Sequence, residues 1–354
     1  MNTRGYLVLI GVAALLAGLS ALAYMSSQQG PAPAMSSRLF PDLMGRINDV
    51  TSIELTGPEG QVRMTRQGNG WVLPEKTGVP AVEARVRPLI IALAELEGGE
   101  PKTTNPDLYT RIGVEEPGEA GDSTLLTVSD ASGQTLASLI LGKTEWISSR
   151  QMRYVRKSGD VQSWLIEFKP DTSLDASVWA EKTLTRVDGS RVKSVVIRQP
   201  SGEEMILTKT TPEQPHYEVA PIPEGRSLRS EGVADPLARG LQQLNFEDVR
   251  PAGQSLEGLV TAITFQTFDG LTIRMSVVDE AGSKWATLTA EGAAAEKPEE
   301  LAELQARFAG REFQLPTWAF NNLNKRMIDM IASSAPQPED PLDQPLGPLL
   351  DPDG

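Results

Sequence analysis

The stretch VTSIELTGPEGQVRMTR, residues 50–66, decides the fold, because a closely similar stretch, VKSVVIRQPSGEEMILTK, occupies residues 192–209. The two stretches align without gaps at an offset of 142. Each alternates apolar and polar residues and turns at a Pro-x-Gly, which is typical of a half-buried β-hairpin. The matched pairs are Val50 and Val192, Ser52 and Ser194, Pro58 and Pro200, and Gly60 and Gly202.

A second pair of blocks predicts one helix in each copy. Leucines spaced i, i+4 and i+7 form one helical face, and the proline before them suits a first turn, where no backbone N–H is needed. Asp235 is a good N-cap for the second helix, and Gly98-Gly99 would stop the first. The matched residues, at an offset of 148, are Pro88-Leu89, Leu93 and Leu96, and Pro236-Leu237, Leu241 and Leu244.

Two further blocks complete the repeat. TVSDASGQTL from Thr127 matches TFQTFDGLTI from Thr264 at an offset of 137 and predicts a second hairpin. Its turn falls at Gly133 in the first copy and at Gly270 in the second. The last block predicts a short helix led by tryptophan. At an offset of 139 it pairs Trp179-Ala180 and Leu184 with Trp318-Ala319 and Leu323.

Four blocks in the same order indicate two tandem copies of one module, residues 47–187 and 188–332. Strands and helices are mixed without regular βαβ alternation. We therefore expect the α+β class, with two duplicated modules of mainly antiparallel sheet with helices.

The two ends of the chain differ from these modules. Residues 6–24 carry no charge and are long enough, at about 1.5 Å per residue, to cross a hydrocarbon core. Arg4 precedes them, which predicts a cytoplasmic N-terminus (residues 1–5), a single transmembrane helix in the inner membrane and a body in the periplasm or outside the cell. A signal peptide cleaved after the ALA at 21–23 is the alternative. Residues 25–46 read as a linker, and residues 333–354 as a disordered, acidic, proline-rich tail.

Composition excludes several classes of function. The net charge of −14 disfavours nucleic-acid partners, because an acidic surface repels phosphates. The absence of cysteine excludes disulfides, thiolate metal sites and a cysteine nucleophile. With one histidine in the chain, most histidine-based chemistry is also removed.

We find no catalytic, cofactor-binding or metal-ligating motif. His216 could be a general base or a lone metal ligand, but a loop histidine beside Tyr217 is the simpler interpretation, and no Gly-x-Ser-x-Gly elbow accompanies it. Adjacent acids read as solvated surface groups or as helix-start residues. These pairs are Glu115-Glu116, Glu203-Glu204 and Glu299-Glu300.

Two groups of residues suggest binding instead. The six tryptophans could line a groove, although packing inside each module explains Trp179 and Trp318 more simply. The local basic cluster Arg150, Arg153, Arg156 and Lys157 is a possible partner-docking edge for an acidic partner, with a solvated strand and turn as the alternative.

The first module resembles domain-of-unknown-function family 4340. The resemblance rests on LYTRIGVEEP (108–117), LILGKT (139–144), RQMRYVRKSGDVQSWLIE (150–167) and WVLPE (71–75). The second module resembles it more weakly. The family has no established activity, so the resemblance implies no catalytic residues. Its members often occur with components of an ABC-type transport system similar to those of gliding motility, which implies an extracytoplasmic accessory subunit.

From these observations we expect a non-enzymatic, membrane-anchored extracytoplasmic protein that acts as an accessory or scaffold subunit of an ABC-type transport system, with permease or other membrane subunits as partners. A glycan- or small-ligand-binding module is one alternative, with an aromatic-lined pocket at the joint of the modules. An envelope hydrolase with two facing carboxylates is another.

Overall fold

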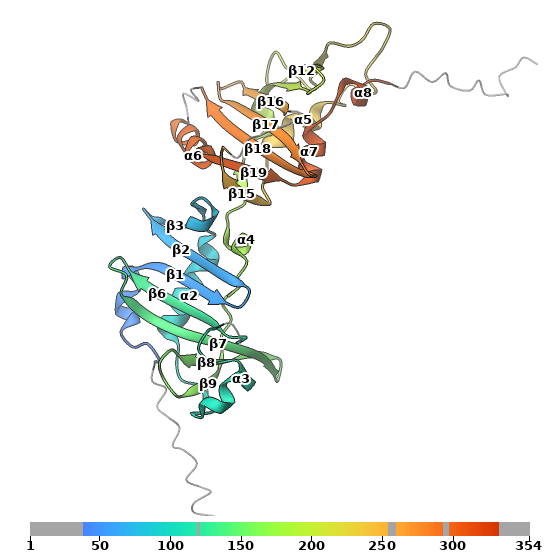
Figure 1. The fold of residues 1–354 in the computed structure, drawn as a ribbon. Helices are drawn as coiled ribbons and strands as arrows, with labels where there is room; N and C mark the ends of the chain where they lie inside the picture. The colour runs from blue at the N-terminus through green and yellow to red at the C-terminus, as the bar shows by residue number, and fades with distance from the viewer. Residues whose placement is uncertain (1–37, 119–120, 254–259, 293–296, 333–354) are drawn as a thin grey trace, which may run out of the picture. The chain divides into compact units, whose positions relative to one another are not determined.

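The computed structural model describes residues 38–118, 121–253, 260–292 and 297–332, which divide into two compact units (Figure 1). Of the described residues, unit 1 comprises those up to Glu75 and Pro80–Ala180, and unit 2 comprises Lys76–Val79 and those from Glu181 onward. The predicted boundary between residues 187 and 188 lies further along the chain. The intervening segment belongs to unit 2 because β10 (Thr183–Thr185) pairs with β14 (Leu244–Asn245).

The predicted membrane helix, residues 6–24, and the predicted tail, residues 333–354, lie outside the described residues, as do residues 1–5. Across the described ranges, no helix is both long enough and apolar enough to cross a bilayer. The predicted linker, 25–46, is wrong at its C-terminal end. Phe40 and Leu43 are 5% and 1% exposed, so this part of the chain belongs to the core of unit 1.

Unit 1 is one antiparallel sheet with a helix against it (Figure 1). Its longest helix, α2, spans Glu83–Glu95, and short α3 and α4 span Tyr109–Ile112 and Ala176–Trp179. The 3₁₀ helices are η1 (Leu43–Asp49), η2 (Pro74–Lys76, shared with unit 2 at Lys76) and η3 (Pro106–Leu108). The strands are β1 (Val50–Gly57), β2 (Gly60–Gln67), β3 (Gly70–Leu73), β4 (Val79–Pro80), β5 (Glu100–Pro101), β6 (Thr124–Asp130), β7 (Thr135–Ile147), β8 (Arg150–Lys157) and β9 (Ser163–Glu167).

Unit 2 is also built on one large antiparallel sheet, beside the β10–β14 pair. Its helices are η4 (Gly189–Arg191), α5 (Asp235–Ala238), η5 (Arg239–Leu241), α6 (Pro298–Phe308), α7 (Thr317–Leu323) and α8 (Met327–Met330). The strands of the large sheet are β11 (Val192–Arg198), β12 (Glu204–Thr208), β13 (Glu218–Ala220), β15 (Asp248–Pro251), β16 (Val260–Thr267), β17 (Thr272–Glu280), β18 (Ser283–Glu291) and β19 (Arg311–Leu315).

The two sheets share one strand order. In unit 1 it is β4-β3-β2-β1-β6-β7-β8-β9-β5, and in unit 2 it is β13-β12-β11-β16-β17-β18-β19-β15. Apart from the extra edge strand β4, the two orders are the same when strands are counted along the chain. A register irregularity also recurs, between Val50 and Ser52 in β1 and between Val192 and Ser194 in β11. The mainly antiparallel α+β class is therefore confirmed.

The gapless alignment of the first hairpins is wrong by one residue beyond the turn. Ile53 pairs with Met64, and the equivalent Val195 pairs with Leu207, so the second strands match at an offset of 143. The loop between β11 and β12 holds the extra residue. Because side chains alternate across a sheet, a one-residue shift exchanges its faces. Burial agrees with the corrected offset, since Met64 and Leu207 are both fully buried.

The paired helices also differ from the prediction. Helix α2 begins at Glu83, so Pro88 lies inside it rather than in its first turn, and it ends before Gly98-Gly99. In unit 2 the predicted long helix is one turn of α-helix followed by η5, and Leu244 lies in a strand. Asp235 makes no capping bond.

The predicted hairpin turns at Gly133 and Gly270 are confirmed. The two residues have φ of 81° and 91°, a region that favours glycine.

The main core of unit 1 lies on the face of the sheet that α2 covers, and a smaller cluster of Tyr109, Val114 and Ile140 lies on the other face. In unit 1, Val86, Leu89 and Leu93 of α2 are fully buried, together with alternate strand residues such as Ile53 and Leu126. This i, i+3, i+7 spacing puts one helical face against the sheet. Each unit thus has its own hydrophobic core. Each unit also has an open groove on its surface, beside α2 in unit 1 and beside α5 and η5 in unit 2.

Candidate functional site

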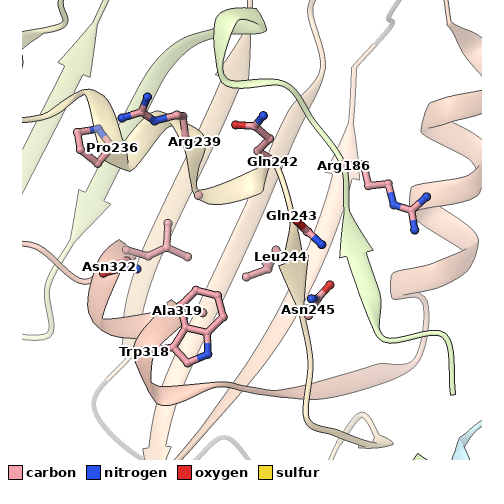
Figure 2. Close-up of a pocket in the computed structure, with 12 residues that line it drawn as sticks. Arg186, Pro236, Arg239, Gln242, Gln243, Leu244, Asn245, Trp318, Ala319 and Asn322 are labelled. Carbon is pink, nitrogen blue, oxygen red and sulfur yellow. The ribbon is translucent and has the colours of Figure 1, made fainter. Parts of the chain in front are cut away.

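An open groove of about 880 Å³ lies in unit 2. Its walls come from α5 and η5, from the segment that contains β14, and from α7 (Figure 2). We call it the unit 2 groove. The residues that line it are Arg186, Pro236, Arg239, Gly240, Gln242, Gln243, Leu244, Asn245, Trp318, Ala319, Asn322 and Leu323.

Trp318 provides the aromatic surface of this groove. Its side chain is 62% exposed, whereas Trp71 and Trp179 are 6% and 0% exposed. Figure 2 shows the Trp318 ring on the α7 side, with Asn245 on the β14 side. The prediction that Trp179 and Trp318 pack equivalently is therefore wrong. Trp179 ends α4 and donates its indole N–H to the Ser173 carbonyl oxygen at 2.9 Å, while Trp318 stands in the first turn of α7.

Four side-chain amides add donors and acceptors along the groove. Gln242, Gln243 and Asn322 are exposed, and the side-chain oxygen Oδ1 of Asn245 is buried with no hydrogen-bond partner in the described part of the chain. An amide offers two N–H donors and one carbonyl acceptor. A buried amide oxygen without a partner costs free energy, about 1–3 kcal/mol. The three exposed amides therefore favour an occupant that carries hydrogen-bonding groups of its own.

The charge of the unit 2 groove is positive. Arg186 Nη2 lies 3.7 Å from Glu181 Oε1, and the Arg186 side chain is 73% exposed, so this pair is weak. Arg239 is exposed and has no carboxylate within 4.0 Å among the residues that the structure describes. No acidic residue lines this groove within the same ranges.

A second open groove, of about 910 Å³, lies in unit 1 between α2 and the β5–β9 edge. Its floor is more apolar, with Ile91 45% exposed on α2. We call it the unit 1 groove. It is lined by Pro88, Ile91, Ala92, Glu95, Leu96, Glu97, Gly98, Gly99, Glu100, Met152, Leu165, Ile166, Glu167, Phe168, Lys169 and Pro170.

Two carboxylates of the unit 1 groove are paired with lysines. Glu100 and Glu167 pair with Lys102 and Lys169 at 2.8 and 2.7 Å. The hydrogen bond from Lys169 holds the pKa of Glu167 below its ordinary value. A general acid for sugar hydrolysis requires the opposite shift.

Comparison with known proteins identifies the family. The model of a domain of unknown function, DUF4340, matches residues 71–259, more than half of the 354 residues. This chain belongs to the DUF4340 family. The resemblance inferred from the sequence motifs is thereby confirmed, and the match extends from β3 of unit 1 past β15 of unit 2. No curated protein and no solved structure matches the chain.

The single histidine of this DUF4340 protein forms a hydrogen bond with the first residue of α5, the helix that lines one side of the unit 2 groove. His216 Nδ1 lies 2.8 Å from Asp235 Oδ2, and the Tyr217 backbone N–H donates to Asp235 Oδ1 at 3.2 Å. The pair fixes the start of α5 on the loop before β13. A triad needs a nucleophile on the other ring nitrogen, and in the described ranges no hydroxyl bonds to His216.

The four residues of the predicted docking edge lie on β8 of the DUF4340 chain and differ in exposure. Arg156 is 4% exposed and donates to the carbonyl oxygens of Val114 and Asp160 at 2.8 and 2.7 Å. Arg153 donates to Thr172 Oγ1 at 2.7 Å. The Lys157 ammonium lies 5.6 Å from the centre of the Phe40 ring, and Arg150 is exposed. The alternation of side chains along a strand could not predict that three of these cations contact other residues of unit 1.

At least one acid of each adjacent pair forms a hydrogen bond or an ion pair with another part of the protein. Glu116 pairs with Arg156 at 3.1 Å, and Glu203 Oε1 accepts from the Met327 backbone N–H at 2.9 Å. Glu300, at the start of α6, accepts from Arg191 at 2.8 Å. In the described ranges, no group of three or more histidine or acidic residues is arranged to hold a metal ion.

Proposed function

We propose that this DUF4340 protein is a non-enzymatic, membrane-anchored extracytoplasmic protein that acts as an accessory or scaffold subunit of an ABC-type transport system. The observation that carries the proposal is the presence of two units of the same strand order, each with an open surface groove. A chain built this way offers two separate sites for partners. The uncharged residues 6–24 would hold it on the membrane, beside the subunits that it serves.

We also propose that the two units arose by tandem duplication of one module. The shared strand order and the recurring irregularity before Ser52 and Ser194 support this origin. Superposition of the backbones of the shared strands of unit 1 on those of unit 2 would agree with it. Shared strands that do not superpose would contradict it.

The accessory role is tested by photo-crosslinking in cells that express the full chain. A photoreactive residue replaces Ile91 in the unit 1 groove or Trp318 in the unit 2 groove, and the matched control replaces Val161, which is 59% exposed outside both grooves. We expect permease or other membrane subunits to be captured from a groove position and not from Val161. Capture of wall components alone, or equal capture from all three positions, contradicts the proposal.

The location is tested separately. A protease added to spheroplasts should digest the two units while cytoplasmic proteins stay intact. Protection of the units until the membrane is dissolved would place them inside the cell and overturn this part of the proposal.

A further inference from the structure

We propose that the unit 2 groove is the docking site of this chain's own C-terminal segment, residues 333–354. The inference goes beyond the proposed function and does not depend on it. It combines three features: the positive charge of the groove, its exposed tryptophan with neighbouring amides, and the point at which the described chain ends.

Charge complementarity favours this occupant. The C-terminal segment, SSAPQPEDPLDQPLGPLLDPDG, contains five acidic residues and no lysine or arginine. Arg186 and Arg239 line the groove without a close carboxylate, apart from the 3.7 Å contact of Arg186 with Glu181. The whole chain carries a net charge of −14, so most of its surface repels an acidic segment. The unit 2 groove, which is lined by cations and no acids, attracts one.

The chemistry of the groove also suits a proline-rich peptide. The segment contains six prolines, and such segments form extended helices that dock on exposed aromatic rings. Trp318 supplies the ring and an indole N–H donor. The amide N–H groups of Gln242, Gln243 and Asn322 can donate to the free carbonyls of an extended peptide.

The path of the chain permits this contact. Helix α7, which carries Trp318 and Asn322, is followed directly by α8, and the described chain ends at residue 332. Extended residues span roughly 3.3 Å each, so ten residues of the segment reach roughly 30 Å, about the width of a small domain. A tethered segment has an effective concentration on the order of millimolar. Weak contacts are therefore sufficient for docking within one molecule.

The unit 1 groove is a poor site for the same segment. Glu95 lines it, and so do Glu97, Glu100 and Glu167. An acidic segment would face repulsion there. Because the lining residues of the two grooves differ in charge, the proposal assigns the segment to the unit 2 groove.

Cysteine crosslinking tests the proposal cleanly, since the chain has no cysteine of its own. Asn322→Cys is combined in the full chain with Leu342→Cys, Leu346→Cys or Leu350→Cys, and a short bismaleimide is added. The control pairs the same three positions with Lys193→Cys, an exposed residue of β11 outside the groove. We expect at least one Asn322 pair to crosslink within a monomer, several times faster than its Lys193 counterpart.

Variants of the groove identify the contacts responsible. The double change Arg186→Gln and Arg239→Gln should lower the crosslinking rate roughly two- to tenfold, as expected for two exposed ion pairs. Trp318→Ala should lower it by a similar factor, through loss of the aromatic contact. Because these side chains are exposed, the variants should fold normally, which circular dichroism would verify.

The outcomes separate the proposal from its rivals. Equal rates for the Asn322 and Lys193 pairs would mean that the segment samples the surface at random, and the proposal would be overturned. Crosslinked dimers without crosslinked monomers would assign the groove to a second copy of the chain, and would also overturn it. Rates unaffected by the arginine and tryptophan variants would remove the groove as the cause of any crosslink.

Discussion

The unit 1 groove and the unit 2 groove each have one wall that aligns at an offset of 148, but these walls present different chemistry. The opposite walls are not equivalent, since β5 and β9 line the unit 1 groove and α7 lines the unit 2 groove. The aligned pairs are Pro88 and Pro236, Ile91 and Arg239, Ala92 and Gly240, Glu95 and Gln243, Leu96 and Leu244, and Glu97 and Asn245. Proline and leucine are kept, although Pro88 lies inside α2 and Pro236 lies in the first turn of α5. An apolar residue and two acids in unit 1 correspond to an arginine and two amides in unit 2, so the side chains of the aligned wall determine what each groove can bind.

The Trp-Ala motif gives the sharpest test of this comparison. Trp179→Ala should destabilise unit 1 by about 3–5 kcal/mol, because it empties a fully buried site and removes the bond to Ser173. Trp318→Ala should change the free energy of unfolding of unit 2 by no more than about 0.5 kcal/mol, since its side chain is largely exposed. Hydrogen exchange followed by mass spectrometry reports each unit separately. Similar losses for the two variants would restore the prediction of equivalent roles.

Gly240 tests the floor of the unit 2 groove. A Cβ at this position would overlap Leu323 Cδ2, so in Gly240→Ala the Leu323 side chain must change its rotamer or α7 must shift. We expect a loss of about 1–3 kcal/mol from overpacking. Denaturant titration of the full chain measures it. Gly45→Ala is the matched control: no atom lies within 4 Å of its added Cβ, so a comparable loss there would show that clash is not the cause.

An arginine before the first strand of each unit provides a third comparison. Arg191 donates to Asp269 and Glu300 at 2.6 and 2.8 Å, and its side chain is 18% exposed. The hydrogen bond to Glu300 raises the pKa of Arg191. Partial burial alone would raise the pKa of Asp269, but the hydrogen bonds from Thr267 and Arg191 outweigh it and hold this pKa below its ordinary value. Arg46 contacts Asp130 at 2.8 Å but is 36% exposed.

Arg191→Gln should therefore cost unit 2 about 1–2 kcal/mol, and Arg46→Gln should cost unit 1 less. The depressed pKa of Asp269 adds a pH dependence. Its contribution is present above the ordinary aspartate pKa of 3.8 and is lost as the pH falls through the lowered value. Acid titration of stability should show a smaller decline in Arg191→Gln than in the parent chain. Parallel acid profiles for the two proteins would contradict this assignment.

The sequence predicted the parts of the fold that repeat, for physical reasons. Alternation with a turn glycine fixes a hairpin locally, which is why Gly133 and Gly270 stand where expected. The alignment could not reveal the extra residue in the β11–β12 loop, because a loop insertion and a strand residue look alike in one sequence. The helix of unit 2 was overestimated because the leucine spacing does not distinguish a long helix from one turn followed by a strand.

The grooves were beyond sequence reasoning. Exposure of Trp318 depends on whether it begins or ends its helix, and the identical Trp-Ala dipeptide gives no signal of this difference. Arg156 looked like a surface cation, yet its guanidinium is buried 4.5 Å from the centre of the Tyr109 ring. A long-range contact of this kind joins residues 47 positions apart by number (156 − 109), and local periodicity carries no information about it.

Tyr217 gives the smallest and most specific prediction. By strand register it is the counterpart of Trp71, since Val72 pairs with Thr65 as Glu218 pairs with Thr208. Burial raises the pKa of Tyr217 to about 12, and its hydroxyl donates to the Val192 carbonyl oxygen at 2.6 Å. A phenol whose pKa is raised on folding stabilises unit 2 below pH 10, and this stability is lost as the pH rises toward 12.

Tyr217→Phe should cost about 0.5–1.5 kcal/mol at neutral pH through the lost hydrogen bond, and should remove that alkaline decline from unit 2. Ultraviolet titration of the parent chain minus the variant isolates one phenol that ionises near pH 12. Trp71 cannot ionise, so replacing it would leave the phenol titration unchanged. A difference spectrum centred near pH 10 would mean that Tyr217 is solvated, and that Trp71 and Tyr217 do not share a buried position.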